Sequence, residues 1–556
     1  MYNIYLIQAQ YFNIFNDRKQ YWLPYSVGCL WAYAKTFSFV TDNFSLKDII
    51  YYREKHKNIL NRLDKPDLVF FSNYTWNEQY NLKLAKSIKK TYPNTHIVFG
   101  GPQTTQRHLD LSFIDSVVFF EGEESFVNIL SDFLNKTLKK IYKSDRITDL
   151  AVLPSPYTSG VFDEIMSKNS DFWQATLETN RGCPFGCTFC DWGSLTLSKI
   201  KQFPLSKVEE ELKWVSKNKI SYVYLADANF GIFKERDTQI AHLIKKYFDS
   251  SHVDGFTTNW TKNSSETVID IFKILQKYSN RGLTLATQSM NADVLSAIKR
   301  KNLAADTYNL LFKKLDEEKI PYYTEFILGL PNETLTSWKD GLCNVLELGL
   351  HDKIDFWLAE VLPNSELSQP DYVKKYDIKT KLISNNFNIY HSSDDIEELQ
   401  KIVVSTNTMS TLDMIEGYMY AWMIQSFHSS GFSQLQARLA YTNGISYRQF
   451  YNRFYEKIQT TSPLNTFFFK FRDEVEKTFS KDKKSDANFI HAREKNGLDF
   501  WNNYSKNIQD IGNSILFEFN IPFEKSTDKN FIEVLHDSIS NRNKGNISSI
   551  ISELLI

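Results

Sequence analysis

The sequence predicts an α/β protein in three parts: a doubly wound N-terminal domain, a partial (β/α)6 barrel and a mostly helical C-terminal region. Two series of short apolar runs alternate with helical patterns, which is typical of parallel sheets covered by helices on both faces. A stretch with Pro and Gly separates the two series, and the alternation stops after residue 370. At 556 residues the chain is too long for one ordinary core. We therefore expect domains at 1–150 and 171–370, a linker at 151–170 and a helical region at 371–556.

The first 150 residues carry four candidate strands separated by helical patterns. The strand segments are short and continuously apolar, as in the buried strands of a parallel sheet. Because helices connect them, the simplest arrangement is a doubly wound, Rossmann-like domain, whose ligands bind at the carboxyl ends of the strands. We expect the strands at Asn3–Gln8, Leu68–Ser72, His96–Gly100 and Ser116–Phe120, and helices at Pro24–Thr36, at Gln79–Thr91 and from Glu123.

The second series contains six candidate strands, and a helical stretch follows each of the first five. Six units are too few for a closed eight-stranded barrel, so we expect an open, partial one with its chemistry at the carboxyl ends of the strands. Pro154, Pro156 and Gly160 mark the preceding residues 147–171 as a linker. The strands are expected at Ala175–Asn180, Tyr222–Ala226, Gly255–Thr258, Leu283–Thr287, Tyr322–Leu328 and Lys353–Glu360, with helices at Leu205–Lys217, Glu235–Tyr247 and Ser265–Tyr278.

The C-terminal region is expected to be helical and to cover the mouth of the barrel. Thr411–Phe427 and Ser446–Ile458 have helical patterns, and the polar stretch Lys481–Lys495 is expected to link them to a last helical piece. An aromatic stripe on a helix is more often core than a stacking surface, and a lone histidine beside it is more often structural than a base. The residues concerned are Tyr418, Tyr420, Trp422 and His428.

The charges of the chain nearly cancel. Lys plus Arg number 65 and Asp plus Glu 66, so no global basic field attracts nucleic acid or anionic lipid. The first residues lack the basic start of a signal peptide, and no apolar run approaches the ~20 residues of a membrane span. We expect a cytoplasmic protein with no membrane or nucleic-acid partner.

Three of the five cysteines lie within eight positions, directly after the first strand of the second series. Thiolates are the usual ligands of cubane iron–sulfur clusters, and three of them leave the fourth iron open for a ligand. A zinc knuckle would need a fourth Cys or His nearby, but the closest downstream histidine is His242. We therefore expect Cys183, Cys187 and Cys190 to hold a [4Fe–4S] cluster.

Other small residues have simpler expected roles. Gly182 and Gly186 are expected to let the loop wrap closely around the cluster. Cys29 and Cys343 are far from the motif and are expected to be small buried apolar residues. This usage of cysteine favours metal binding in a reducing compartment over a disulfide framework, and it provides too few thiols for an auxiliary cluster.

The spacing Cys183-x-x-x-Cys187-x-x-Cys190, with the aromatic Phe189 before the third cysteine, resembles the motif of the radical SAM superfamily. The resemblance spans residues 170–365. It implies that the open iron binds S-adenosylmethionine and that one electron cleaves this ligand to a 5′-deoxyadenosyl radical. It also implies an electron donor such as flavodoxin or ferredoxin.

The resemblance continues at the ends of successive strands. The segment 227–231 departs from the commoner Gly-Gly-Glu form and resembles the version in cobalamin-dependent members. The implied contacts to S-adenosylmethionine are Asp227 and Asn229 for the amino group, Gln288 and Ser289 for ribose and carboxylate, Arg300 for the carboxylate and Glu325 for adenine, with Val361–Pro363 similarly placed.

A doubly wound domain before such a barrel resembles the cobalamin-binding domain of the cobalamin-dependent branch. The resemblance implies that the small residues Ser72, Gly100 and Gly101 admit the dimethylbenzimidazole tail between strands and helices, with backbone amides near the nucleotide phosphate. The matching segments are Leu23–Gly28, Ser72–Asn77, Gly100–Pro102 and Glu121–Glu124.

The Asp-x-His-x-x-Gly motif of many cobalamin proteins is absent, because neither His56, His96 nor His108 follows the first strand in that pattern. Trp76 or Asn77 is expected over the lower face of the corrin. An inert flavodoxin-like remnant or a site for another nucleotide are the alternatives, although a Gly-x-Gly-x-x-Gly dinucleotide fingerprint is absent.

The leading functional hypothesis is a cobalamin-dependent radical SAM methyltransferase that acts on an unactivated carbon of a small molecule or peptide. One S-adenosylmethionine would methylate cob(I)alamin, and a second would give the radical. The alternatives are a rearrangement, cyclisation or oxidation without methyl transfer and, from another class, a non-catalytic iron–sulfur or cobalamin-binding sensor. A tRNA methylthiotransferase is disfavoured, because its N-terminal domain needs three cysteines and this one has only Cys29.

Overall fold

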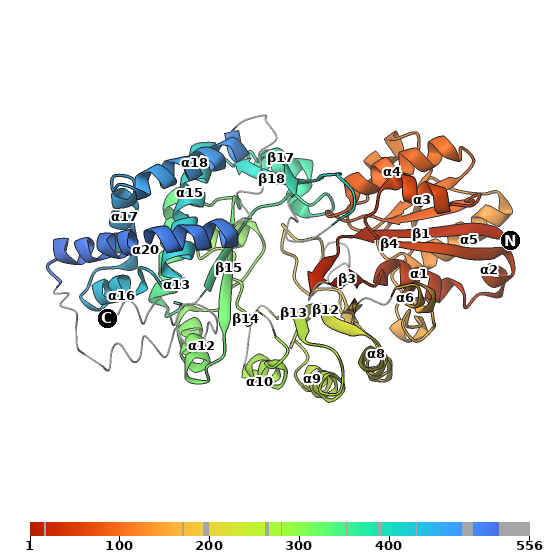
Figure 1. Cartoon of the computed structure of the whole chain (residues 1–556), viewed down its shortest axis with the longest axis horizontal. Coiled ribbons are helices and arrows are strands. Elements are labelled where there is room, and N and C mark those ends of the chain that lie inside the picture. Colours follow the sequence, from red (N-terminus) through yellow and green to blue (C-terminus); the bar gives the residue numbers. More distant parts are fainter. Residues whose placement is uncertain are drawn as a thin grey trace.

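The computed structural model has three regions in a row (Figure 1). The N-terminal sheet lies at one end, the barrel strands lie in the middle, and the C-terminal helices lie at the other end. It describes residues 1–15, 18–169, 172–192, 199–261, 266–279, 281–351, 353–385, 392–429, 431–480 and 493–521.

The N-terminal region is built on a parallel sheet of six strands in the order β4-β1-β5-β6-β7-β8. Helices α1 and α5 pack on one face of this sheet and α3 and α4 on the other, each over its own apolar core. The doubly wound prediction is therefore confirmed. The strands are β1 (Tyr2–Gln10), β4 (Phe44–Tyr52), β5 (Leu68–Ser72), β6 (His96–Gly100), β7 (Ser116–Phe119) and β8 (Ile141–Lys143), and the helices α1 (Tyr25–Ala34), α2 (Ser38–Asn43), α3 (His56–Arg62), α4 (Glu78–Thr91), η1 (Gln106–Asp110) and α5 (Glu123–Asn135).

The two sheets share the first fifty residues of the chain. After β1, a short hairpin of β2 (Asn13–Phe15) and β3 (Arg18–Trp22) leaves the N-terminal sheet and joins the barrel sheet. β3 pairs in parallel with β9 (Phe172–Leu177), so residues 18–22 belong structurally to the barrel. The sequence pattern predicted neither this hairpin nor β4.

The barrel is open, as predicted. One sheet has the order β13-β12-β9-β3-β2 and the other the order β14-β15-β16, and a single bridge between Phe256 and Ser279 extends the first toward the second. The remaining strands are β10 (Asn180–Arg181), β11 (Lys201–Gln202), β12 (Ile220–Phe230), β13 (Gly255–Trp260), β14 (Leu283–Thr284), β15 (Tyr322–Leu328) and β16 (Lys353–Leu358); the helices are α8 (Leu205–Lys217), α9 (Lys234–Phe248), α10 (Glu266–Leu275), α11 (Ala292–Ala297), α12 (Ala305–Glu317) and α13 (Leu335–Glu347).

The segment predicted as a linker is packed into the protein. It contains η2 (Leu150–Val152) and α6 (Asp163–Ser167), and Leu153, Tyr157 and Phe162 are buried. A Cβ on Gly28 of α1 would overlap the Phe162 ring, which explains the small residue at that point of α1.

The C-terminal region is mostly helical, but a β-hairpin precedes its helices. β17 (Lys379–Asn385) and β18 (Glu398–Ser405) pair antiparallel, and neither strand was predicted from the sequence. Residues 481–492 of the predicted lysine-rich link lie outside the described residues, and Arg493 already begins a helix. The helical elements are η3 (Glu366–Ser368), α14 (Pro370–Lys375), α15 (Thr411–Met423), the π-helical turn Ile424–His428, α16 (Gln434–Thr442), α17 (Tyr447–Ile458), α18 (Leu464–Ser480) and α20 (Arg493–Glu518).

The aromatic stripe of α15 is core, as expected. Tyr418, Tyr420 and Trp422 are buried, and His428 is enclosed with its two ring nitrogens beside His351 and the Tyr451 hydroxyl. The two cysteines outside the motif, Cys29 and Cys343, are also buried, and burial raises the pKa of each thiol to about 12. Both are small buried residues, as expected, and the Cys343 thiol contacts the Tyr420 hydroxyl.

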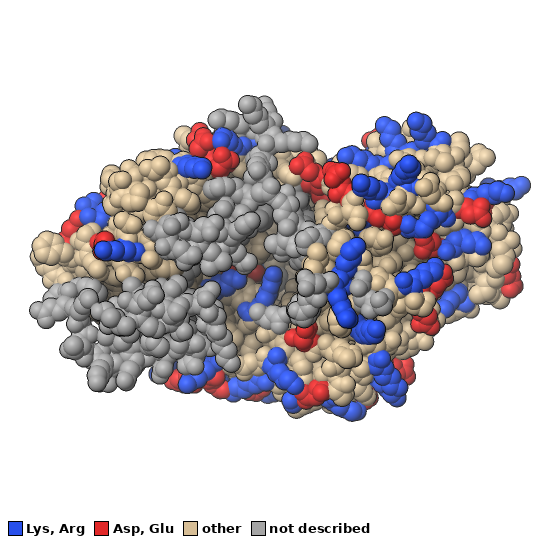
Figure 2. Space-filling model, viewed as in Figure 1, with Lys and Arg blue, Asp and Glu red and all other residues tan. Residues whose placement is uncertain are grey.

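The surface carries both signs of charge, and on the face shown in Figure 2 the basic and acidic side chains are interspersed over the described part. Within the described ranges, no helix combines the length and apolar character that crossing a membrane requires.

Candidate active site

The cluster motif lies in a loop that starts from a paired backbone segment. β10 pairs antiparallel with β11, and Gly182 follows with φ +112°. A Cβ on Gly182 would overlap the Lys199 carbonyl, so only glycine fits there. A Cβ on Gly186 would meet nothing within 4 Å. The wrapping of both glycines around the cluster stays a prediction; the structure adds that Gly182 is also required by its close approach to the Lys199 backbone.

The outer side of the loop rests on α11 and the segment after β16. The Thr188 N–H donates to the Ile298 carbonyl, and the Thr188 carbonyl accepts from the Leu367 N–H at 2.8 Å. The Thr188 hydroxyl lies 3.0 Å from the Tyr372 hydroxyl, which donates to the Ala297 carbonyl. Phe189 packs on the apolar cluster beneath these residues. The loop is therefore held from behind.

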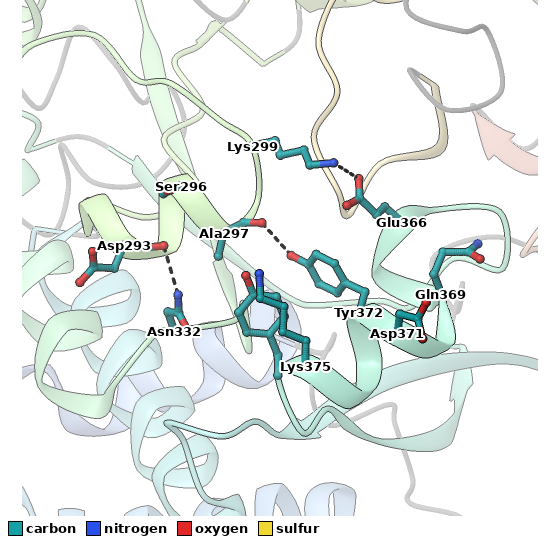
Figure 3. Close-up of a pocket in the computed structure, with 11 residues that line it drawn as sticks. Asp293, Ser296, Ala297, Lys299, Asn332, Glu366, Gln369, Asp371, Tyr372 and Lys375 are labelled. Carbon is teal, nitrogen blue, oxygen red and sulfur yellow. Dashed lines mark hydrogen bonds and ion pairs between the residues drawn. The ribbon is translucent and has the colours of Figure 1, made fainter.

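A surface pocket of about 500 Å³ lies beyond this support (Figure 3). Tyr372 points from α14 toward Ala297 at its centre, and Lys299 pairs with Glu366 at its rim. The pocket is lined by groups of both charges and by none of the three motif cysteines, and its lining residue Tyr372 contacts Thr188 of the motif. It therefore lies against the back of the motif loop.

The three cysteines of the motif form no disulfide. Cys183 and Cys187 are buried, and Cys190 is half-buried. Among the described residues, no three His, Cys, Asp or Glu side chains are placed to hold one metal ion. In a cubane each thiolate binds a different iron, so the cluster itself separates its ligands. The arrangement is thus compatible with a cluster and offers no closed site for a single ion.

Three polar side chains next to the motif have buried atoms without a hydrogen-bond partner. Asn229 donates through Nδ2 to Cys183 Sγ at 3.3 Å, while its Oδ1 is unpartnered. Arg300 lies within hydrogen-bonding reach of Cys187 and donates to the Ala286 carbonyl, but its Nη1 is unpartnered. The same is true of Oε1 of Gln288, whose backbone has φ +59°. Because orphaned buried groups are costly, these atoms indicate a missing polar ligand.

Arg300 occupies a different environment from an ordinary helix residue. It follows α11 and is buried, and its Nε donates to Asn302, whose Nδ2 donates to the carbonyls of Thr287 and Ser289. Burial lowers the pKa of Arg300, and the neighbouring Cys187 opposes this effect. The cation is thus held between the cluster loop and the segment that carries Gln288.

Asp227 was expected at the end of the second barrel strand. It lies inside β12 instead, three residues before the strand ends at Phe230. Its carboxylate accepts hydrogen bonds from the backbone N–H groups of Thr179 and Asn180, from the Asn180 amide at 2.7 Å and from the Thr179 hydroxyl. Burial raises its pKa to about 7. Asp227 therefore anchors the chain between β9 and β10, ahead of the motif.

Ser289 and Glu325 also have partners within the protein. The Ser289 hydroxyl donates to Glu333 at 2.6 Å, while Glu325 accepts from the Trp357 indole at 3.4 Å. Glu325 lies in the middle of β15, not at its end, and burial raises its pKa with a further contribution from Asp355. Contacts of these two residues with a ligand stay predictions.

The concave face of the barrel strands is polar and aromatic. Along β12, buried residues that pack under the helices alternate with half-buried residues that face the opposite side. A half-exposed Trp357 shows that this side is open to solvent. The hydrogen-bonded pairs on it are Tyr222–Thr257, Asn259–Tyr224 and Trp357–Glu325.

A second set of orphaned atoms lies at the carboxyl edge of the N-terminal sheet. Ser72 and Gly100 end adjacent strands in register, and the backbone of Asn73 packs so tightly on Gly101 that a Cβ there would lie 2.7 Å from the Asn73 carbonyl oxygen. Nδ2 of Asn73, Nε1 of Trp76 and Oγ1 of Thr104 are buried without a partner. Asn73 lies in the segment Ser72–Asn77 that resembles cobalamin-binding domains but was not predicted as a contact, and Thr104, four residues after the predicted strand end at Gly100, was missed.

Of the two candidates for the lower corrin face, Trp76 is the available one. Its ring stacks on Tyr74 with centroids 4.3 Å apart. Asn77 is fully buried, and its side chain binds the Tyr74 N–H and the carbonyls of Ala9 and Ser72, so it is a structural residue.

The histidines of this region also serve the fold. His96 begins β6 at the opposite edge and contacts Ser116, and His108 is engaged by Thr105 and Glu78. His56 packs on the Tyr80 ring, and burial lowers its pKa to about 4. All three histidines therefore make contacts within the protein, and none of them follows β1 in the Asp-x-His-x-x-Gly pattern.

Comparisons with known proteins match both regions. Residues 177–340 match the radical SAM superfamily and residues 45–130 the B12 binding domain. The cobalamin-dependent radical SAM methyltransferase TokK of Streptomyces tokunonensis is 31% identical over 455 residues, which are 77% of this chain and 67% of TokK. This protein belongs to the cobalamin-dependent radical SAM enzymes.

Further relatives of this radical SAM enzyme agree in sequence or in fold. The 2-(S-pantetheinyl)-carbapenam-3-carboxylate methyltransferase of Streptantibioticus cattleyicolor is 30% identical, over 78% of this chain and 67% of that protein. The cobalamin-dependent S-adenosylmethionine radical enzyme OxsB shares the fold over 97% of this chain and 84% of its own, with a TM-score of 0.53 and 14% identity. The methyltransferase TsrM of Kitasatospora setae has a TM-score of 0.50 at 12% identity, over 75% of this chain and 89% of its own.

The cofactors of this enzyme are a [4Fe–4S] cluster, S-adenosylmethionine and cobalamin. The residues present fit them. Two amide oxygens, on Asn229 and Gln288, can accept from an ammonium group or hydroxyls, and the guanidinium of Arg300 can donate to a carboxylate. The free donors of Asn73 and Trp76 lie at the sheet edge where doubly wound domains bind ligands.

Proposed function

We propose that this protein is a methyltransferase that transfers a methyl group to an unactivated carbon of a small molecule or peptide, with Cys183, Cys187 and Cys190 as the cluster ligands. The observation that supports this most directly is that two groups of buried polar atoms without partners lie on adjoining parts of the protein, one at the carboxyl edge of the N-terminal sheet and one beside the cluster loop. The carboxyl edge of the N-terminal sheet contacts the start of the cluster loop through an ion pair of Glu123 with Arg181.

When bound, the cluster supplies an electron that cleaves S-adenosylmethionine, and cobalamin supplies the methyl group. The chain's own residues hold these groups in place. In the proposal, Arg300 pairs with the ligand carboxylate, and Asn229 and Gln288 accept from its amino and hydroxyl groups. Trp76 would lie over the lower face of the corrin, and Ser72, Gly100 and Gly101 would lie along the nucleotide tail.

The substrate is proposed to bind on the concave barrel face, where Tyr222, Tyr224, Asn259 and Trp357 offer aromatic surface and hydrogen bonds. One relative is named for methylating 2-(S-pantetheinyl)-carbapenam-3-carboxylate, so this compound is the first substrate to test. The reaction also needs a low-potential reductant, and a flavodoxin or ferredoxin is proposed as the donor.

The test is anaerobic turnover of the reconstituted enzyme with S-adenosylmethionine labelled in its methyl group. Methyl transfer predicts labelled product and both S-adenosylhomocysteine and 5′-deoxyadenosine. 5′-Deoxyadenosine together with a changed but unmethylated substrate would support rearrangement, cyclisation or oxidation instead. An intact cluster that cleaves nothing after reduction would favour a sensor.

A further inference from the structure

Two arginines cross the seam between the cobalamin-binding region and the cluster loop. On one side stand Glu121 and Glu123, which follow β7 at the carboxyl edge of the N-terminal sheet. Arg146, which lies after β8 of the same sheet, stands with them, and Arg181, which lies two residues before the first cluster cysteine, stands on the other side. The parallel strands place the acids on the same edge as Ser72 and Gly100.

Arg181 joins acids from both regions. Its Nη1 lies 2.8 Å from Glu123 on the first turn of α5, and its Nε lies 2.9 Å from Glu178 at the end of β9. Glu178 also accepts from the Tyr25 hydroxyl of α1 at 3.2 Å. Both side chains of the Arg181–Glu123 pair are largely buried, with 13% and 5% exposed, so water screens this pair little.

Arg146 holds the backbone on either side of the loop. Its Nε donates to Glu121 at 2.9 Å, and its two terminal nitrogens donate to the carbonyls of Lys199 and Arg181. The Lys199 carbonyl is the group that faces Gly182. The ammonium of Lys201 in turn donates to the Ile147 carbonyl at 2.7 Å.

These contacts share one consequence. The backbone of residues 181–182 is fixed by groups that belong to the N-terminal sheet, and Cys183 follows at once. A guanidinium fork that meets carboxylates and carbonyls in set directions fixes orientation as well as distance. Sequence segments 23–28 and 121–124, which resemble cobalamin-binding motifs, thus have Tyr25, Glu121 and Glu123 turned toward the barrel.

We propose that Arg146 and Arg181, with Glu121 and Glu123, are positioning residues that set the separation and orientation of the cluster relative to the corrin. The proposal rests on the proposed corrin site at the carboxyl edge of the N-terminal sheet. It does not require methyl transfer or knowledge of the substrate. None of the four side chains needs to touch either cofactor.

The experiment measures the magnetic coupling between the reduced cluster and cob(II)alamin by pulsed EPR, in the holoenzyme without substrate. Glu123→Gln and Arg181→Met remove one charge of the pair, and Arg181→Lys keeps the charge but loses the fork. Arg62→Met is the matched control, because Arg62 pairs with Glu54 and Asp48 within the N-terminal region. We expect at least a twofold broader distribution of couplings in Arg181→Met and Glu123→Gln, a smaller change in Arg181→Lys, and none in Arg62→Met.

A wild-type distribution in Arg181→Met and Glu123→Gln, at full iron and cobalt content, would overturn the proposal. If the variants fail to load, amide hydrogen exchange of the cofactor-free proteins decides. At least tenfold faster exchange in Glu123→Gln at residues 121–126 and 180–184 supports the positioning role of the four side chains, and unchanged exchange overturns it. Absence of coupling in the wild type would show that the proposed corrin site is wrong, whereas absence of S-adenosylhomocysteine in turnover affects only the methyl-transfer proposal.

Discussion

Nδ2 of Asn229 donates a hydrogen bond to Sγ of Cys183 over 3.3 Å, from a strand that is not part of the cluster loop. Hydrogen bonds to ligand sulfurs help set cluster potentials, because they stabilise the more negative, reduced form. We expect Asn229→Leu to lower the reduction potential of the cluster with unchanged iron content. An EPR-monitored redox titration without S-adenosylmethionine measures this. Asn259→Leu, on the exposed part of neighbouring β13, is the control and should leave the potential unchanged.

Substitution by alanine should have very different effects at the two glycines of the cluster loop. Gly182→Ala puts a Cβ onto the Lys199 carbonyl at φ +112°, so it should destabilise the protein by about 2 kcal/mol or more and reduce the iron bound after reconstitution. Gly186→Ala meets open space and should change stability by less than about 0.5 kcal/mol. Thermal unfolding and iron counts of both variants test this, and equal losses in the two would contradict it.

A buried arginine fastens the C-terminal hairpin to the N-terminal region. Arg53 has no exposed side-chain surface and pairs with Asp394 and Glu398, while Glu398 also accepts from the first-turn N–H groups of α4. Arg53→Met leaves these carboxylates buried and unpaired, so we expect a loss of about 3–5 kcal/mol in unfolding free energy. Arg62→Met, which removes a half-exposed arginine from its pair with Glu54, should cost less, about 1 kcal/mol. Denaturant unfolding of both variants provides the measurement.

The sequence predicted several elements whose own residues carry a clear strand or helix pattern. Leu68–Ser72, His96–Gly100, Tyr322–Leu328 and Leu205–Lys217 were predicted with the bounds that the structure has. β4 was missed because Lys47 and Asp48 interrupt its apolar pattern, and these residues are tolerated at the edge of a sheet. The β2–β3 hairpin was missed because its partner, β9, lies 150 residues away and leaves no local pattern.

The site shows the same limit. The chain at 227–231 was interpreted as a strand end because it resembles the segment that follows the second barrel strand in the family. The structure continues β12 to Phe230, since the amides of Thr179 and Asn180 satisfy Asp227 from another strand. The spacing of the cysteines and the order of the strand-end motifs were readable from the chain. The contacts among Arg146, Arg181, Glu121 and Glu123 could not be predicted from the chain, because ion pairs between residues far apart in the sequence leave no periodic pattern.

The enclosed His428 predicts how stability depends on pH. Burial lowers its pKa to about 3, and the nearby Arg438 adds to this, while His351 and the Tyr451 hydroxyl contact the ring. In the unfolded chain this imidazole therefore binds a proton as the pH falls through 6.5, whereas in the folded protein it binds one only near pH 3. The stability that His428 contributes is complete above pH 6.5 and decreases as the pH falls through this window.

We expect this histidine to give a slope of up to about 1.4 kcal/mol per pH unit below pH 6. His56, whose pKa burial lowers to about 4, adds to the same acid limb. In His428→Gln the amide keeps hydrogen-bonding capacity but cannot titrate, so unfolding free energies measured between pH 7 and pH 5 should decrease less steeply than in the wild type. His252→Gln, at an exposed position, should keep the wild-type slope. A His428→Gln variant with the full wild-type slope would show that other groups cause the acid sensitivity.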